Sequence, residues 1–139
     1  MKTQNKKMGK KGAAAVEFAI ILPLIVMLVF GTIEFGLMFY NKQVITNASR
    51  EAARSAITGA TVSEVKQIAM EYCNGKLFNL DGSINLSTAD IDVPPLDGSD
   101  QSVAISFDYN FLFSQVIGVT DPITVSVRTI MRMEPGAGS

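Results

Sequence analysis

The sequence predicts an α+β protein in which a long N-terminal transmembrane helix extends into a small domain with a second helix and a 2–4-stranded antiparallel sheet. Three observations predict this fold class. Residues 18–33 are apolar and uncharged, helix-compatible sequence continues to residue 57, and apolar and polar residues alternate over about 102–111 and 122–133. A chain of 139 residues has room for one small folded domain besides the membrane helix.

The apolar run is long enough to cross a bilayer. With its flanks it covers residues 13–40, and within them only Glu17 and Glu34 are charged. About 20 helical residues span a typical hydrocarbon core, and a domain of this size could not cover a helix that is apolar on every side. We therefore expect a transmembrane helix at residues 13–40. A cleaved secretory signal is the alternative, but bulky Phe39 and Tyr40 stand where its small-residue cleavage site would be.

The charge distribution predicts the orientation of this helix. Residues 1–12 carry five lysines and no acid, whereas acids outnumber bases from residue 41 onward. Positive charge before an apolar run favours a cytoplasmic N-terminus, so an extracytoplasmic domain is expected at residues 41–134 and a loose tail at 135–139. The same distribution argues against nucleic-acid binding, because no basic cluster lies in the folded part.

Helical and strand periodicities outline the extracytoplasmic domain. A helix over residues 41–57 continues the membrane helix and places Val44, Ala48, Ala52 and Ala56 on one face. A second helix is expected at 61–73, capped by Thr61 or Ser63 and ended by Asn74-Gly75, with an apolar face of Val62, Val65, Ile68, Ala69 and Tyr72.

Residues 79–101 read as irregular, with one short strand near residues 90–93. The two alternating segments then predict an antiparallel pair joined by a short helix within 112–119. Their inward residues are Val103, Ile105, Phe107, Tyr109 and Phe111 in the first and Ile123, Val125, Val127, Thr129 and Met131 in the second.

Residue counts exclude several kinds of chemistry. The chain has one cysteine, Cys73, and no histidine, so an internal disulfide, a Cys/His metal site and the common histidine-dependent catalytic groups are all excluded. We expect no enzyme, no cofactor, no metal site and no small-molecule substrate. Cys73 is expected to be half-buried on the second helix, with a cross-link between subunits as the alternative.

An acidic loop leaves calcium binding open. Asn79, Asp81 and Gly82 resemble the start of a calcium-binding loop, but Thr88 stands where its closing acid should be, which favours a simple turn. A solvated loop is the default interpretation of the remaining acids, and a calcium site is the alternative: Asp90, Asp92, Asp97 and Asp100.

Two residues, Glu17 and Pro23, are unusual in an ordinary membrane anchor, and Glu34 is interpreted separately. A carboxylate such as Glu17 is costly in lipid and has a partner unless it lies solvated among the headgroups. Pro23 removes a backbone hydrogen bond inside the helix. Glu34 is interpreted as a solvated acid at the interface beside Phe35 and Phe39, or as a contact with a neighbouring subunit.

The segment Lys10-Lys11-Gly12, followed by Ala13 to Phe18, resembles the signal of prepilins that are cleaved between a glycine and the next residue. If Ala13 is the first mature residue, Glu17 is the fifth and Phe18 the sixth, and this Glu-Phe pair is typical of the Tad/Flp branch. Over residues 9–57 the chain resembles the TadE-like family, whose features are matched by Leu22-Pro23, Ile33-Glu34-Phe35-Gly36, Phe39-Tyr40, and Asn47, Arg50, Glu51 and Arg54. Ala53 departs from the family pattern, in which glycine is common, and TadF- and TadG-type proteins share the signal.

The resemblance implies a minor pilin (pseudopilin) of the bacterial cytoplasmic membrane, processed after Gly12 by a prepilin peptidase. Its partners would be other pilins and the pilus assembly proteins of that membrane. It also implies that Glu17 pairs with the new amine of Ala13 or of a neighbour, and that the helix itself mediates assembly through residues along its length: Glu17, Pro23, Glu34, Phe35, Gly36, Phe39 and Tyr40. The alternative is an uncleaved, single-pass tethered module.

Overall fold

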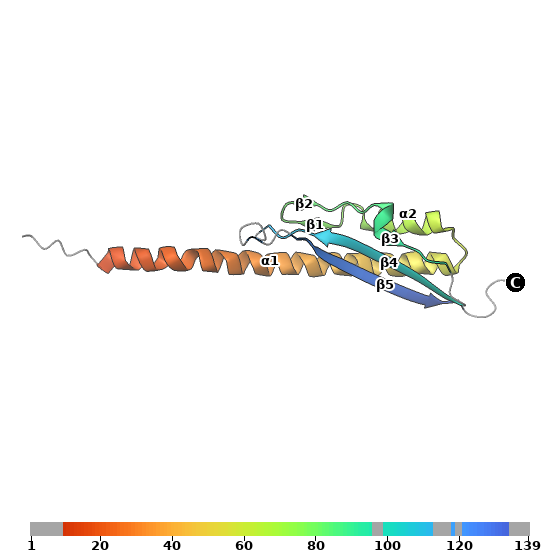
Figure 1. The fold of residues 1–139 in the computed structure, drawn as a ribbon, viewed down its shortest axis with the longest axis horizontal. Coiled ribbons are helices and arrows are strands. Elements are labelled where there is room, and N and C mark those ends of the chain that lie inside the picture. The colour runs from red at the N-terminus through yellow and green to blue at the C-terminus, as the bar shows by residue number, and fades with distance from the viewer. Residues whose placement is uncertain (1–9, 96–98, 113–117, 119–120, 134–139) are drawn as a thin grey trace, which may run out of the picture.

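The structure, a computed structural model, describes residues 10–95, 99–112, 118 and 121–133. A single helix, α1 (Lys10–Ile57), runs along the molecule, and the other elements pack on its C-terminal half (Figure 1). The predicted α+β fold class is confirmed. The first part of the predicted leader, the predicted tail and most of the predicted helix within 112–119 lie outside the described residues.

The two halves of α1 have different surroundings. Its 48 residues give a length of about 72 Å. The large apolar side chains between Val16 and Ile33 are exposed or nearly so, whereas Ile45, Ala48 and Ala52 are completely buried. Alanine side chains are short, so α2 and the sheet approach the backbone of α1 closely there.

Helix α2 (Val62–Cys73) begins one residue later than predicted, because Thr61 is its cap. The Thr61 hydroxyl accepts a hydrogen bond from the backbone N–H of Glu64, and the Glu64 carboxylate accepts one from the backbone N–H of Thr61. This pair holds the pKa of Glu64 below its usual value. After the helix, Gly75 adopts a φ of 67°, as the predicted glycine stop requires.

The apolar face predicted for α2 is partly wrong. Val65 and Ala69 are buried as expected, but Val62 is exposed, and Cys73 is buried instead. The helix packs on α1 by a narrow stripe at i, i+4 spacing, and Val62 lies in its first turn, beyond this contact.

Two antiparallel sheets complete the domain. β1 (Phe78–Asn79) pairs with β2 (Gly82–Ser83) in a short hairpin. A short 3₁₀ helix, η1 (Thr88–Asp90), leads into β3 (Ile91–Asp92), which pairs with β4 (Asp100–Tyr109), and β4 pairs with β5 (Ile123–Arg132) from Asp100–Arg132 to Tyr109–Ile123.

The alternation predicted for β4 matches its buried face, since Val103, Ile105, Phe107 and Tyr109 are all buried. In β5 only Val125 is buried, and Ile123, which was predicted to face inward, is 49% exposed. The reason is its position: Ile123 is the first residue of β5, the edge strand of the three-stranded sheet, so among the described residues a neighbouring strand lies on one side of it only.

Candidate functional site

The residues of the predicted cleavage site lie in the first turns of α1. Ala13 and Glu17 are one helical turn apart, and Gly12 to Phe18 are all exposed. A Cβ atom added to Gly12 would meet nothing within 4 Å, so packing in this chain does not require a glycine there. Among the described residues, no partner is found for the Glu17 carboxylate.

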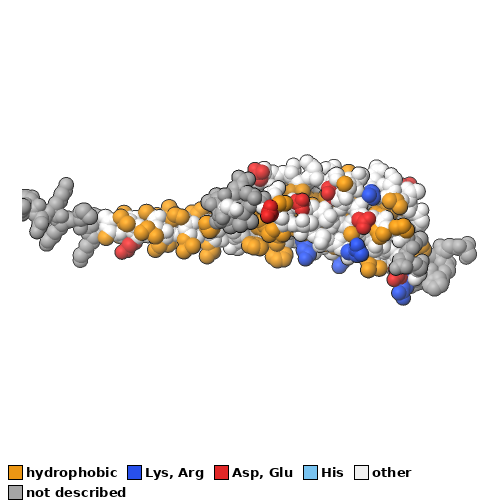
Figure 2. Space-filling view, viewed as in Figure 1, with side chains coloured by type: hydrophobic (Ala, Val, Ile, Leu, Met, Phe, Trp, Pro, Cys, Tyr) orange, Lys and Arg blue, Asp and Glu red, His pale blue; other side chains and the backbone are white. Residues whose placement is uncertain are grey.

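Hydrophobic side chains cover the N-terminal half of the helix, and most charged side chains gather on the domain (Figure 2). In the described chain, α1 alone is long and apolar enough to cross a membrane, and its apolar window is not buried within the protein. Pro23 lies within this half without interrupting the helix. The surface of this segment is suited to lipid or to other apolar helices.

Glu34 differs from both sequence interpretations, because it is 1% exposed and bonded within its own chain. Its carboxylate accepts a hydrogen bond from the backbone N–H of Leu112, just beyond β4. The hydroxyl of Tyr109 donates to the backbone oxygen of Glu34 over 3.4 Å. Burial, with the Glu34 charge nearby, raises the pKa of Tyr109 to about 12. Glu34 therefore joins the membrane helix to the sheet.

The aromatic residues that follow Glu34 remain largely exposed. The ring of Phe35 lies 5.5 Å from that of Phe111, and the ring of Tyr40 lies 5.3 Å from that of Phe78. Phe39 is 60% exposed. A Cβ atom at Gly36 would meet nothing within 4 Å, so this glycine, like Gly12, is not needed for packing in one chain.

The predicted residues beyond the membrane lie on the exposed face of α1: Asn47, Arg50, Glu51 and Arg54. None of the three charged residues among them forms an ion pair with another described residue; the ion pair found in the described chain joins Arg132 of β5 to Asp100 of β4, at 2.9 Å. The opposite face is buried and includes Ala53 and Ser49, whose hydroxyl lies 2.6 Å from that of Thr129 in β5. The exposed charges are thus available to other molecules.

Asn41 is a structural residue that sequence reasoning missed. Its completely buried side chain donates to the backbone oxygen of Phe78 over 2.7 Å and accepts from the backbone N–H of Phe78 over 3.3 Å. It therefore attaches β1 to α1 at the height where the membrane helix meets the domain. Its side chain type gave no signal in the sequence, because Asn41 is simply the first of three polar residues, Asn41-Lys42-Gln43, that follow the apolar run.

Asn41→Ala is expected to lower the free energy of unfolding by about 1–2 kcal/mol, because the backbone N–H and C=O of Phe78 lose the partner that the buried Asn41 side chain provides. Asn47→Ala is the matched control, since it removes the same side chain from the exposed face of the same helix. Its effect should stay within about 0.5 kcal/mol. Urea unfolding of the full chain in detergent micelles measures both, and equal effects would contradict the role of Asn41.

Two of the four acids considered for calcium, Asp90 and Asp100, have other contacts. Asp100 pairs with Arg132, which lowers the pKa of Asp100, and Asp90 accepts hydrogen bonds from the backbone and hydroxyl of Ser87. The Asn79 side chain accepts from the backbone N–H of Asp81, as in a simple turn. The described residues contain no group of three metal-ligating side chains, and Asp97 lies outside them.

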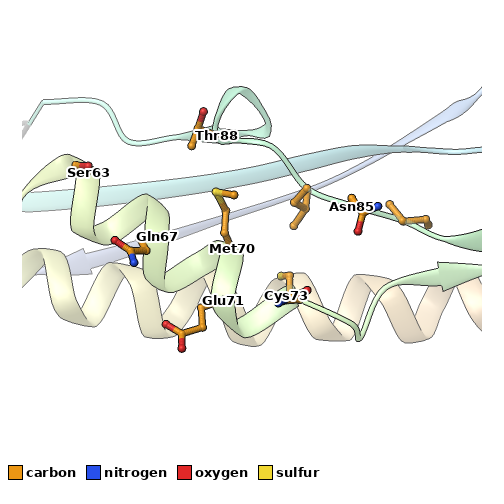
Figure 3. A pocket seen from close by; sticks show the side chains of 10 residues that line it. Ser63, Gln67, Met70, Glu71, Cys73, Asn85 and Thr88 are labelled. Atoms are coloured by element: carbon orange, nitrogen blue, oxygen red, sulfur yellow. The ribbon is translucent and has the colours of Figure 1, made fainter.

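An open groove of about 620 Å³ lies between α2 and residues 84–88 (Figure 3). The side chains that line it include Gln67, Met70 and Cys73 of α2 and Thr88 on the opposite side. No arrangement of these side chains indicates a reaction. Cys73 is 2% exposed, and burial raises its pKa from 9.0 to about 11 against the opposing charge of Lys76.

Cys73 should therefore alkylate slowly. The raised pKa alone lowers the thiolate fraction at pH 7 by about 100-fold, since the pKa moves from 9.0 to about 11. We expect iodoacetamide to modify the native chain at least that much more slowly than the urea-unfolded chain. Gln67→Cys in a Cys73→Ser background provides an exposed control on the same helix, and equal rates for the two thiols would contradict the buried position.

The structure thus defines a class of protein: a small α+β domain carried on one long helix whose apolar half suits a membrane. Its exposed residues show no catalytic arrangement within the described chain. The model of the TadE-like protein family matches residues 12–54, which confirms the family resemblance over this segment. No curated protein and no solved structure matches the chain.

Proposed function

We propose that this chain is a minor pilin (pseudopilin) that takes part in assembling a Tad/Flp-type pilus. The observation that carries the proposal is the continuity of α1. One helix begins before Gly12, exposes an apolar surface through the membrane segment, and ends in the core of the domain. The TadE-like match covers this same helix and starts at Gly12.

The proposed domain organisation follows from this helix. Residues 1–12 form a basic leader, residues 13–40 cross the bacterial cytoplasmic membrane, and residues 41–134 fold on its outer side, with a tail at 135–139. The lysines of the leader favour the cytoplasmic side for the N-terminus. Other pilins and the pilus assembly proteins of that membrane are the proposed partners, and the exposed face with Arg50 and Arg54 is available to them.

Processing would change the charge of the chain. A prepilin peptidase would hydrolyse the bond between Gly12 and Ala13, leaving a carboxylate on Gly12 and an ammonium group on Ala13. Residues 13–139 would then carry a formal side-chain charge of −6, because five lysines leave a chain whose net charge is −1. The new ammonium group would lie one helical turn from Glu17, where opposite charges attract.

This pairing explains why an acid is placed in an otherwise apolar segment. An unpaired carboxylate is unfavourable in a medium of low dielectric constant, and a paired one is much less so. Glu17 lacks a partner among the described residues of the unprocessed chain, so the ammonium group of Ala13, in the same or a neighbouring subunit, would supply it. The small side chains Ala13, Ala14 and Ala15 would allow neighbouring helices to approach closely.

Gly12→Ala tests entry into the pilin pathway. The added methyl group meets no neighbour, so α1 should fold unchanged, and a loss of processing would reflect recognition by the peptidase. Gly36→Ala is the matched control, because that glycine lies in the same helix with equal free space. We expect Gly12→Ala to keep its leader and Gly36→Ala to be processed, as measured by the mass of each protein from membranes that contain the peptidase.

Glu17→Ala separates processing from assembly. This variant is expected to lose its leader normally but to co-purify poorly with the pilus fraction, because its N-terminal ammonium group has no carboxylate partner. Normal processing of Gly12→Ala would contradict the proposal and would favour an uncleaved tethered module.

A further inference from the structure

We propose that the end of the domain next to the membrane helix rests in the lipid headgroup layer, so that loops of the domain bind the bilayer in addition to α1. This inference rests on the membrane anchoring in the proposed function. It concerns a surface built from α1, the β1–β2 hairpin and the β4–β5 end of the larger sheet (Figure 1).

Exposed apolar side chains are concentrated at this end. Beyond Glu34, nine large apolar side chains of the described chain are exposed, and two of them, Val62 and Ile130, lie toward the far end of the domain. The other seven form what we call the apolar collar: Phe35, Phe39, Tyr40, Phe78, Leu80, Leu112 and Ile123. Single exposed apolar side chains are common on protein surfaces, whereas a group of them in one place marks an interaction surface.

Specific contacts hold the collar at one height on α1. The backbone N–H of Leu112 binds the Glu34 carboxylate, and Phe78 is bound by the Asn41 side chain. Ile123 lies opposite Tyr109 in the sheet, and the Tyr109 hydroxyl binds the backbone oxygen of Glu34. The parts of the collar from the sheet and the hairpin therefore lie beside the α1 segment 34–41, which is about 10 Å long.

The height of the collar matches the interface of a bilayer. The uncharged residues 18–33 span about 24 Å of helix, and the addition of one turn at the N-terminal end, residues 14–17, gives about 30 Å, the thickness of a typical hydrocarbon core. The next residues, Phe35 to Tyr40, then reach the headgroup layer, where aromatic side chains are favoured. The collar continues the apolar surface of α1 at that height, so the same lipid that surrounds the helix would also cover the collar.

The charges at this end limit how deeply the collar can enter. Asp81, in the turn of the β1–β2 hairpin, and Asp121, before β5, are exposed, so they must remain among hydrated headgroups. Lys42 is exposed just beyond the collar, where its ammonium group can reach lipid phosphates. Glu34, which is the acid at this end of the domain closest to the hydrocarbon, is shielded by its burial and its bond to Leu112.

Contact with lipid would fix the orientation of the domain. A domain joined to a membrane only by a helix can tilt with that helix, whereas a second contact around the helix opposes tilting. The bonds of Glu34 and Asn41 make the helix and the collar one unit, because they join α1 to Leu112 and Phe78. The exposed face of α1 beyond the collar would then stand at a constant height and direction above the membrane.

The test uses tryptophan fluorescence, because the natural chain has no tryptophan. Leu80→Trp and Leu112→Trp place a reporter on the collar, Ile130→Trp places one on the exposed far end, and Leu24→Trp places one within the membrane segment. The four full-length variants are reconstituted at low density into vesicles of phosphatidylcholine and phosphatidylglycerol, with or without bromine on the acyl chains, placed close to the headgroups in one set of vesicles and near the chain ends in a second set that reports on Leu24→Trp. Both leaflets are brominated, so the orientation of the protein does not affect quenching.

We expect bromine to quench Leu24→Trp, Leu80→Trp and Leu112→Trp and to leave Ile130→Trp unchanged. If Leu24→Trp is quenched but both collar variants behave like Ile130→Trp, the collar proposal is overturned and membrane anchoring stands. Emission at shorter wavelength without quenching would show that protein, not lipid, covers the collar, and would also overturn it. If Leu24→Trp is not quenched, the membrane anchoring itself is contradicted.

Discussion

Tyr109→Ala is expected to lower the free energy of unfolding of the domain by about 3–5 kcal/mol, the largest effect of any single substitution considered. Tyr109 is completely buried, and its ring meets that of Phe111 edge to face at 4.9 Å. Its removal leaves a cavity at the end of the sheet and also breaks the hydrogen bond to the backbone of Glu34. The substitution should therefore loosen the sheet where it joins the membrane helix.

Two controls separate these contributions. Tyr109→Phe keeps the ring and removes only a hydrogen bond of 3.4 Å, so its effect should be about 1 kcal/mol or less. Tyr40→Ala removes the same side chain from a position that is 45% exposed, and should also cost less than Tyr109→Ala. Urea unfolding of the full chain in micelles, monitored by the alkylation of buried Cys73, measures the free energy of unfolding of all three variants. A loss for Tyr109→Ala no greater than that for Tyr40→Ala would contradict its position in the core.

Glu34→Ala is expected to give the second largest effect, about 1–3 kcal/mol, because the backbone N–H of Leu112 loses a charged acceptor in a buried position. Glu34→Gln keeps an oxygen acceptor of similar shape and should retain most of the stability. Glu51→Ala is the matched control, since it removes an exposed acid from the same helix, with an effect within about 0.5 kcal/mol. The same unfolding measurement applies, and a stable Glu34→Ala protein would show that this contact is not needed.

The elements with a clear period could be predicted from the sequence. Apolar positions four residues apart placed Val44, Ala48 and Ala52 on the buried face of α1, and the alternation of β4 placed Val103 and Ile105 inward. Both patterns extend over several residues, so the sequence of each element is enough to show which of its faces is buried. β1 and β2 have two residues each and are too short to show a period.

The environment of Glu34 could not be predicted in this way. Hydropathy places it at the edge of the apolar run, which is the normal position of a solvated acid. Its burial depends on Leu112, 78 residues further along the chain. The bond between Asn41 and Phe78 spans 37 residues and is equally invisible in a local pattern. Contacts of this length depend on how the domain folds back on α1, so they appear only in the folded chain.

The predicted cleavage site is a different case, because its interpretation depends on chemistry outside the fold. Gly12 and Gly36 are equally unconstrained by packing, and only the family resemblance gives Gly12 a role in processing. Likewise, Glu17 is an exposed acid in one chain, and its proposed partner exists only after cleavage. The roles of Gly12 and Glu17 are therefore predictions about the processed protein, in which Ala13 carries the new ammonium group.

The most direct test of the central proposal is the N-terminal sequence and intact mass of the protein isolated from its native membranes. We predict that the chain begins at Ala13 and lacks the mass of residues 1–12. A chain that begins at Met1, or at a residue after the apolar segment, would contradict the minor pilin account.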